Sequence, residues 1–266
     1  MTALAQFAYA ALPKGLRIRF LLLLLQLGQS QTIVPLLSAD PLRVEIRPRL
    51  VERIKSRYGD DFDLTPHGVE RPLARRYTAD EQSRVLAAIT AVMDEACRAG
   101  GITDWWFTYG TLLGLIREGA LLPTDDDFDV AYLSRASTPE EVVAERRMIQ
   151  ENLRLLPGVS VVDENGGMFK VSVLSDKVLH FEFDLFTTYQ THRGAEMFMA
   201  PPGIAKTEWF LPTERREFLR ATVVIPRNPE EVLAWLYGDG WKVPDPSYRA
   251  RWYWPEHDFL RQGKIS

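Results

Sequence analysis

Four aspartates stand directly before a stretch with the pattern of a buried strand, in the segment LLPTDDDFDVA at residues 121–131. They are Asp125, Asp126, Asp127 and Asp129. Like charges this close repel one another, and a carboxylate buried without a partner costs several kcal/mol. A fold that places this segment against its core must therefore supply a positive partner. The alternative is a polar turn capped by aspartates, a common use of this residue type.

The pattern around the acidic run predicts helices and strands in mixed order. An amphipathic helix begins near a capping box at Thr78–Glu81 and ends at Gly100 and Gly101. Strands are expected at 105–109, 128–133, 159–162, 168–174, 179–187 and 221–225, and helices at 112–118, 138–155 and 229–237. The acidic run thus lies at the entrance of the second strand.

Three features around this strand point to phosphate chemistry. Gly110 and Thr111 follow a strand and open a short helix, where a glycine lets backbone N–H groups approach a phosphate closely. Residues i and i+2 of a strand point to the same face, so Asp127 and Asp129 are expected to aim at one point. The strand HFEFDLF carries Asp184 on its acidic face. If that strand lies beside the first, Asp184 completes a carboxylate triad.

A divalent cation would resolve the repulsion within this triad. Mg²⁺ prefers oxygen ligands, commonly a few carboxylates together with phosphate oxygens of a substrate. Two such ions can clamp the attacking and leaving oxygens of a displacement at phosphorus. The sequence therefore predicts Mg²⁺, or Mn²⁺, at Asp127, Asp129 and Asp184. The alternative for Asp184 is a surface acid on a half-exposed strand.

The run YGTLLGLIREGALLPTDDDFDVAYL at 109–133 resembles the signature of the LicD family, the bacterial phosphocholine transferases, whose animal relatives are fukutin and the fukutin-related protein. The matching residues are Gly110, Thr111, Leu112, Leu113, Gly114, Arg117, Pro123, Asp125, Asp126, Asp127 and Asp129. Weaker likeness extends to FDLF at 183–186 and to IPRNPEEVLAWLYGDGW at 225–241. Thr124 departs from the family, in which many members carry a bulky aromatic at this place.

The resemblance implies an α+β fold for residues 78–266, with a nucleotidyltransferase-like mixed β-sheet flanked by α-helices. It also implies metal-dependent transfer of a phospho-alcohol group from a CDP-linked donor to a sugar hydroxyl of a glycan or glycolipid. Phosphocholine, ribitol phosphate and glycerol phosphate are all candidate groups, and lipopolysaccharide, teichoic acid and capsule are candidate acceptors. The sequence does not choose among them.

Roles follow for the residues of the signature. Asp127 and Asp129 would bind the metal, and Asp184 would be the third ligand or the base that takes the proton of the acceptor hydroxyl. Gly110 and Thr111 would hold the phosphate of the donor.

Four further charged residues each carry two interpretations. Arg117 is a candidate phosphate clamp, because its planar guanidinium suits two-point phosphate contact, or an exposed arginine at a helix end. Lys170 would neutralise developing charge, or it is a surface lysine. Asp125 and Asp126 either cap a turn or support the metal ligands.

Rival functions share parts of this pattern. A glycosyltransferase uses Asp-x-Asp to hold a metal and a sugar nucleotide, but it does not need the upstream Gly-Thr turn or the strand of Asp184. A nucleotidyltransferase that transfers a nucleoside monophosphate would use the same three carboxylates. A scaffold or binding module with a degenerate site would have lost at least one carboxylate, and all three are present.

Composition limits the partners and the compartment. A formal net charge of -4 argues against broad binding to nucleic acid, which needs a basic face. The single cysteine, Cys97, forms no internal disulfide, so a reducing compartment is the simplest expectation. We therefore expect a cytoplasmic protein, with peripheral contact at the inner face of the membrane as an additional expectation.

That membrane expectation comes from the N-terminal segment. Basic residues precede the apolar run Phe20–Leu25, which is far shorter than the roughly 20 residues that cross a bilayer. Residues 12–28 could form a cleaved signal, an interfacial helix, or a helix packed on the protein's own surface. Residues 31–77, rich in proline and charge, predict an extended lead-in with short helical pieces. Residues 1–77 are thus expected to be an extension of the catalytic domain.

Overall fold

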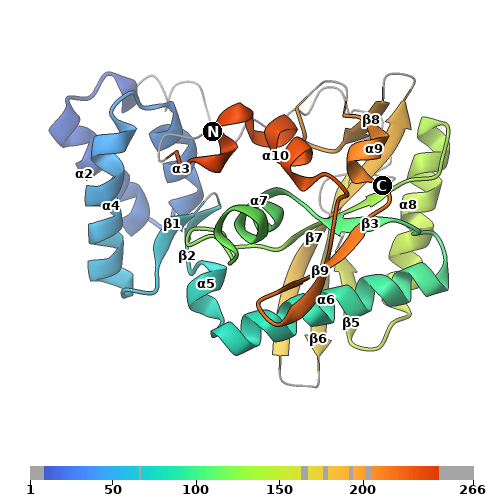
Figure 1. Ribbon diagram of the computed structural model, residues 1–266. Helices are drawn as coiled ribbons and strands as arrows, with labels where there is room; N and C mark the ends of the chain where they lie inside the picture. The colour runs from blue at the N-terminus through green and yellow to red at the C-terminus, as the bar shows by residue number, and fades with distance from the viewer. Residues whose placement is uncertain are drawn as a thin grey trace. The chain divides into compact units, whose positions relative to one another are not determined.

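The computed structural model describes residues 9–65, 67–162, 167–175, 179–191, 194–201 and 205–245 (Figure 1). Contacts divide the chain into two compact units. The first unit takes in Met1–Thr78 and Pro123–Asp126, and the second takes in Ala79–Leu122 and Asp127–Val243. The division between the units therefore passes through the acidic run, between Asp126 and Asp127.

Three helices make up most of the first unit: α2 (Lys14–Gln26), α3 (Ser30–Ala39) and α4 (Arg43–Tyr58). A hairpin of β1 (Asp63–Thr65) and β2 (Gly68–Glu70) follows, and then the single turn α5 (Leu73–Arg76). The helices share a core of buried apolar side chains: Leu21, Leu25, Ile33, Leu36, Leu37, Ile46, Leu50 and Ile54. This core stabilises the helices, because helix stability in proteins comes mainly from packing of an apolar face.

The extended lead-in expected over residues 31–77 is wrong for α3 and α4. Pro35 and Pro48 lie inside these helices, where each removes one intrahelical hydrogen bond. Ile46, Leu50 and Ile54 nevertheless recur every four residues on the buried face of α4. Burial of this face outweighs the local cost of the proline.

A buried polar cluster joins the start of the described chain to the connection between α3 and α4. Asp40 accepts hydrogen bonds from the Tyr9 hydroxyl (2.7 Å), Arg17 Nη1 (2.7 Å) and the Leu42 backbone N–H (2.8 Å). Burial alone would raise the pKa of the Asp40 carboxyl, but these hydrogen bonds and the Arg17 charge hold that pKa below its ordinary value of 3.8. The cluster therefore depends on an ionised Asp40.

The N-terminal helix α2 packs on the protein through one of its faces. Leu21 is fully buried and Leu25 is 3% exposed, in contact with the core of the first unit. This face fits the alternative in which the segment packs on the protein's own surface. Among the described helices, none is both long enough and apolar enough to cross a membrane.

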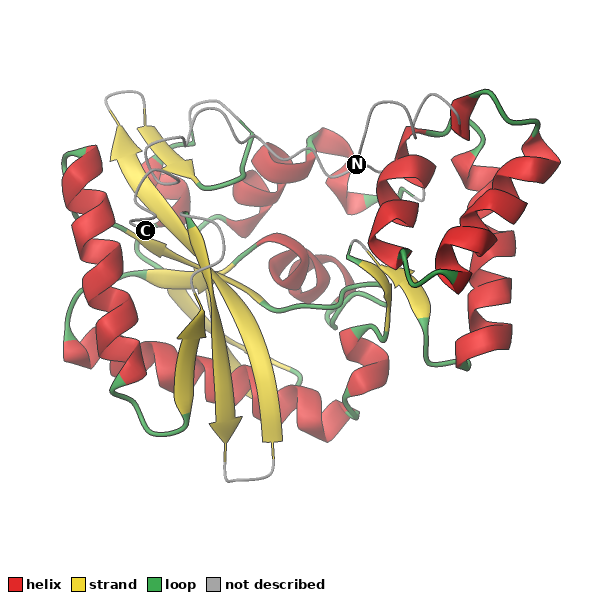
Figure 2. Ribbon diagram, turned by 180° about the vertical axis from the view of Figure 1, so that it is seen from behind, coloured by secondary structure: helices red, strands yellow, loops and turns green. Residues whose placement is uncertain are grey.

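A mixed β-sheet forms the centre of the second unit. Its strands are β3 (Trp105–Phe107), β4 (Asp129–Leu133), β7 (Leu179–Thr191), β6 (Met168–Ser175) and β5 (Val159–Val162), in that spatial order, and β8 (Gly194–Met197) pairs with β7. Strands β4 and β7 run parallel, and the other neighbours run antiparallel. The long helices α6 (Ala79–Ala99) and α8 (Pro139–Arg154) pack beside this sheet (Figures 1 and 2). The α+β class expected from the sequence is confirmed.

The segment after β3 folds into two joined helical turns. The α-helix α7 (Tyr109–Leu113) leads directly into a π-helical turn, η1 (Gly114–Glu118), so the helix expected at 112–118 begins three residues earlier. A Cβ atom at Gly114 would lie 2.6 Å from the Ala120 carbonyl oxygen and 2.9 Å from the Leu122 nitrogen. Only glycine lets the following loop return this closely.

The C-terminal part of the second unit adds a hairpin and short helices. The helix α9 (Thr207–Phe210) precedes the hairpin of β9 (Glu214–Phe218) and β10 (Ala221–Ile225), and α10 (Pro229–Tyr237) and the 3-10 helix η2 (Asp239–Lys242) follow. The bounds of β10 and α10 agree with those expected from the sequence. Strand β10 packs against α6 and β3.

Candidate active site

Two nearly buried carboxylates lie side by side at the centre of the sheet. Asp129 is the first residue of β4 and pairs in register with Asp184 of β7, the strand that runs parallel to it. Their exposed fractions are 6% and 5%. Residues paired across neighbouring strands about 4.8 Å apart share one face of the sheet. The adjacency of strands on which the proposed triad depended is therefore present.

Lys170 extends this pair into a row of three charged residues. It lies on β6 opposite Asp184, and its Nζ donates to Asp184 Oδ1 at 2.7 Å. An ammonium at this distance stabilises the ionised form of the carboxylate. Asp129, Asp184 and Lys170, here called the charged row, thus cross three adjacent strands on one face. Lys170 is therefore a neighbour of the carboxylates, and its role in neutralising developing charge stays a prediction.

Asp129 is held in place by the first turn of α7. Its Oδ2 accepts a hydrogen bond from the Gly110 N–H (3.0 Å), and its own N–H donates to Thr111 Oγ1 (3.0 Å). The Thr108 N–H also donates to the Asp129 carbonyl at 3.0 Å. Tyr109, between them, has a φ of 39°, a left-handed conformation that is uncommon outside glycine. The strand entrance and the Gly-Thr turn therefore form one rigid corner.

These contacts define what Gly110 and Thr111 do within the chain. Thr111 is fully buried, and its hydroxyl oxygen accepts the backbone N–H of Asp129, the first residue of β4. The Gly110 N–H is directed at a carboxylate. Binding of a donor phosphate by these two residues stays a prediction.

Asp127 stands before the strand β4, although alternation along the chain was expected to aim its side chain at the same point as that of Asp129. The strand β4 begins at Asp129, and Asp127 stands in a bend two residues earlier, half-buried. The period-two argument therefore does not fix the direction of its side chain. The Phe128 carbonyl accepts the Asp184 N–H at 2.8 Å, and its ring is fully buried, so hydrogen bonding to β7 starts directly after Asp127.

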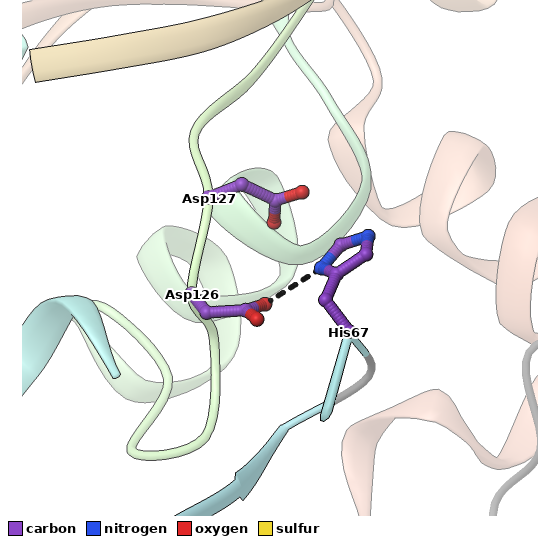
Figure 3. Close-up of side chains that lie close together, drawn as sticks. All are labelled: His67, Asp126 and Asp127. Atoms are coloured by element: carbon purple, nitrogen blue, oxygen red, sulfur yellow. Dashed lines mark hydrogen bonds and ion pairs between the residues drawn. The ribbon is translucent and has the colours of Figure 1, made fainter. Parts of the chain in front are cut away.

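Asp125 and Asp126 belong to the first unit. Asp126 accepts a hydrogen bond from Thr65 Oγ1 (2.6 Å) and lies 3.0 Å from Nδ1 of His67, which sits between β1 and β2. Figure 3 shows His67 and Asp126 joined by this contact, with Asp127 next along the chain. The Asp125 carbonyl accepts the Leu73 N–H at 2.7 Å. His67 was not among the residues expected at the site, because no local spacing in the sequence connects it to a residue 59 positions away.

A comparison with protein families identifies the segment that contains this site. Residues 102–228 match the family model described as LicD/FKTN/FKRP, nucleotidyltransferase domain. The chain carries a LicD-family domain. This domain spans β3 to β10 and includes Asp127 and the whole charged row. A comparison with curated proteins found no match.

The match to a LicD-family domain supports a transferase, in a family of phosphotransferases and glycan-modifying enzymes. Arg117 belongs to the same domain and lies in η1. Its Nε donates to Glu118 Oε1 (2.7 Å) and its Nη1 to the Trp241 carbonyl (3.1 Å), and its side chain is 16% exposed. In this structure Arg117 joins η1 to η2, and its role as a phosphate clamp stays a prediction.

Proposed function

We propose that the LicD-family domain transfers a phospho-alcohol group from a CDP-linked donor to a sugar hydroxyl of a glycan or glycolipid. The observation that carries this proposal is the pairing of Asp129 and Asp184 on parallel strands, both nearly buried. Burial of two neighbouring carboxylates is costly unless positive charge offsets it. A divalent cation bound between the carboxylates and the phosphates of a substrate would supply that charge.

The donor set fits a divalent cation such as Mg²⁺ or Mn²⁺. Asp127, Asp129 and Asp184 offer carboxylate oxygens, the ligand type that these hard cations prefer, and we assign the cation to them. The ammonium of Lys170 offsets only one of these three negative charges. When bound, the cation would neutralise the charge of the phosphates and of the leaving nucleotide.

The reaction that we assign is a displacement at phosphorus. The acceptor hydroxyl oxygen forms a bond to the phosphorus that carries the alcohol, the anhydride bond to the nucleotide breaks, and CMP leaves. We assign the hydroxyl proton to Asp184 and the developing charge on the phosphoryl oxygens to Lys170. Gly110 and Thr111 hold the corner that orients Asp129.

Nucleotide binding tests this proposal in the full chain. CDP with Mg²⁺ is expected to raise the melting temperature of the wild type, and Asp129→Asn is expected to abolish the shift. Glu182→Gln is the matched control, because Glu182 is an exposed carboxylate two residues before Asp184 on the same strand. With CDP-choline, CDP-ribitol and CDP-glycerol as donors, CMP release should fall at least about 100-fold in Asp129→Asn and stay near the wild-type rate in Glu182→Gln.

Other outcomes would contradict the proposal. A shift with UDP-sugars and none with cytidine nucleotides would favour the glycosyltransferase. Pyrophosphate release from a nucleoside triphosphate would favour transfer of a nucleoside monophosphate. Equal CMP release by Asp129→Asn and the wild type would remove the carboxylate pair from the mechanism.

A further inference from the structure

The helix α2 is apolar on two opposite faces, and the core of the first unit covers only one of them. Leu21 and Leu25 are buried in that core. On the opposite side Leu16, Leu23 and Leu27 are 45%, 48% and 64% exposed. Their spacing of seven and four residues places them in one stripe along the helix. We call these three residues the outer leucine face.

The charge of the chain is divided unevenly along the sequence. Residues 1–78 contain twelve Lys and Arg against seven Asp and Glu, a formal charge of +5, although the whole chain carries -4. Within the part of the chain that the structure describes, four exposed arginines of α2 and α4 form no ion pair: Arg19, Arg49, Arg53 and Arg57. The first unit therefore combines exposed leucines with uncompensated positive charge.

We propose that the outer leucine face binds the surface of an anionic lipid membrane. Helices that lie in a membrane interface use this combination, in which apolar side chains enter the acyl boundary and basic residues attract anionic head groups. Attraction to such a surface grows with the number of nearby basic residues and extends over a Debye length of about 10 Å. The inference is independent of the chemistry proposed for the charged row.

A second copy of the chain is the main competing occupant, and two observations disfavour it. The helix α2 has 13 residues, less than two heptads, whereas a coiled coil needs three or four. Pairing of two first units would also bring together two bodies of net positive charge, +3 each once Asp125 and Asp126 are counted with residues 1–78. An anionic surface meets neither obstacle, because it needs no helical register and carries the opposite sign.

The test uses point variants of the full chain, because deletion of α2 would also remove Leu21 and Leu25 from the core. Vesicles of phosphatidylcholine, with or without phosphatidylglycerol, are sedimented with the protein. The wild type is expected to sediment with the anionic vesicles, less so as salt rises, and Leu23→Asp/Leu27→Asp should weaken this binding at least about tenfold. Leu155→Asp is the control, because Leu155 is an 81% exposed leucine at the end of α8.

Circular dichroism of the variants checks that the helices are intact, as expected at exposed positions. Charge reversal by Arg19→Glu should weaken binding to anionic vesicles and leave the helix content unchanged. Absence of wild-type binding to anionic vesicles would overturn the proposal, as would equal binding by Leu23→Asp/Leu27→Asp. If light scattering finds a wild-type dimer that this double variant turns into a monomer without any change in vesicle binding, the face belongs to a second copy instead.

Discussion

Replacement of Lys170 by methionine tests the charge balance of the site without any substrate. Methionine keeps most of the apolar length of the lysine side chain and removes the ammonium that lies 2.7 Å from Asp184 Oδ1. The carboxylate of Asp184 then stays nearly buried beside Asp129 with its strongest described cation gone. We expect the second unit to become less stable in metal-free buffer.

The exposure of the two partners sets the size of this loss. Breaking a fully buried pair costs about 3–5 kcal/mol, and breaking an exposed pair costs about 0–1 kcal/mol. The side chains of Lys170 and Asp184 are 24% and 7% exposed, which lies between these cases but nearer the buried one. We therefore expect Lys170→Met to lower the free energy of unfolding by about 2–3 kcal/mol.

Tryptophan fluorescence measures this loss in the second unit alone. All seven tryptophans lie at or beyond residue 105, so none belongs to residues 1–78. Urea unfolding of the wild type, Lys170→Met, Asp184→Asn and the double variant, all in EDTA, gives the coupling between the two side chains. We expect a coupling of about 2 kcal/mol, with Asp184→Asn alone less costly than Lys170→Met because the lysine left behind can reach solvent.

A coupling below about 0.5 kcal/mol would refute the reasoning, since two independent sites give values of that size. The free energy of unfolding measured after addition of Mg²⁺ is a second test. A divalent cation would replace the missing ammonium, so it should return part of the lost stability to Lys170→Met. The same addition should do much less for Lys170→Met/Asp184→Asn, which lacks one of the proposed ligands.

Three further predictions concern other parts of the chain. Gly114→Ala should destabilise the second unit by about 2 kcal/mol in the same urea assay, because Gly114 has an ordinary helical φ of -62° and the cost is steric, whereas Gly240→Ala, with open space around it, should change little. The lowered pKa of Asp40 contributes stability that is present above about pH 3.8 and is lost as the pH falls through the folded-state pKa. Asp40→Asn should therefore unfold more easily at neutral pH, and its stability, followed by circular dichroism, should fall less than that of the wild type as the pH is lowered. Burial, followed by the charges of nearby aspartates, raises the pKa of the Cys97 thiol to about 11, so iodoacetamide should label it slowly at neutral pH and rapidly in urea, as mass spectrometry would detect.

The carboxylate pair illustrates how far sequence patterns reach. Alternation along HFEFDLF predicted the face of Asp184, and the register with Asp129 agrees with the strand adjacency that the triad required. The same alternation does not extend to Asp127, which stands before the first residue of β4. A strand begins where its partner strands begin to pair with it, and β4 pairs in register with β7 from Asp129 onward and with β3 from Val130 onward. Local alternation does not contain that information.

Strand β9 and the helices α3 and α4 were not expected from the sequence, and each absence has a specific physical reason. Strand β9 reads ERREF and has almost no alternation of apolar and polar residues. Its two-residue turn to β10 is Leu219-Arg220, with φ values of 48° and 62°, where asparagine and glycine are the usual signal. The helices α3 and α4 were not predicted because Pro35 and Pro48, which are disfavoured in helix interiors, lie within them. In each case tertiary packing overrides a local preference.

The assignment of Pro123–Asp126 to the first unit has a practical consequence for the boundaries of any shortened gene. The segment is anchored through Thr65, His67 and Leu73, all of which lie upstream of the residues that the family model matches. A protein trimmed to begin at residue 102, or at the start of α6, would retain the acidic run and lose every one of these anchors. The hairpin of β1 and β2, the turn α5 and the acidic run therefore have to be expressed as one piece.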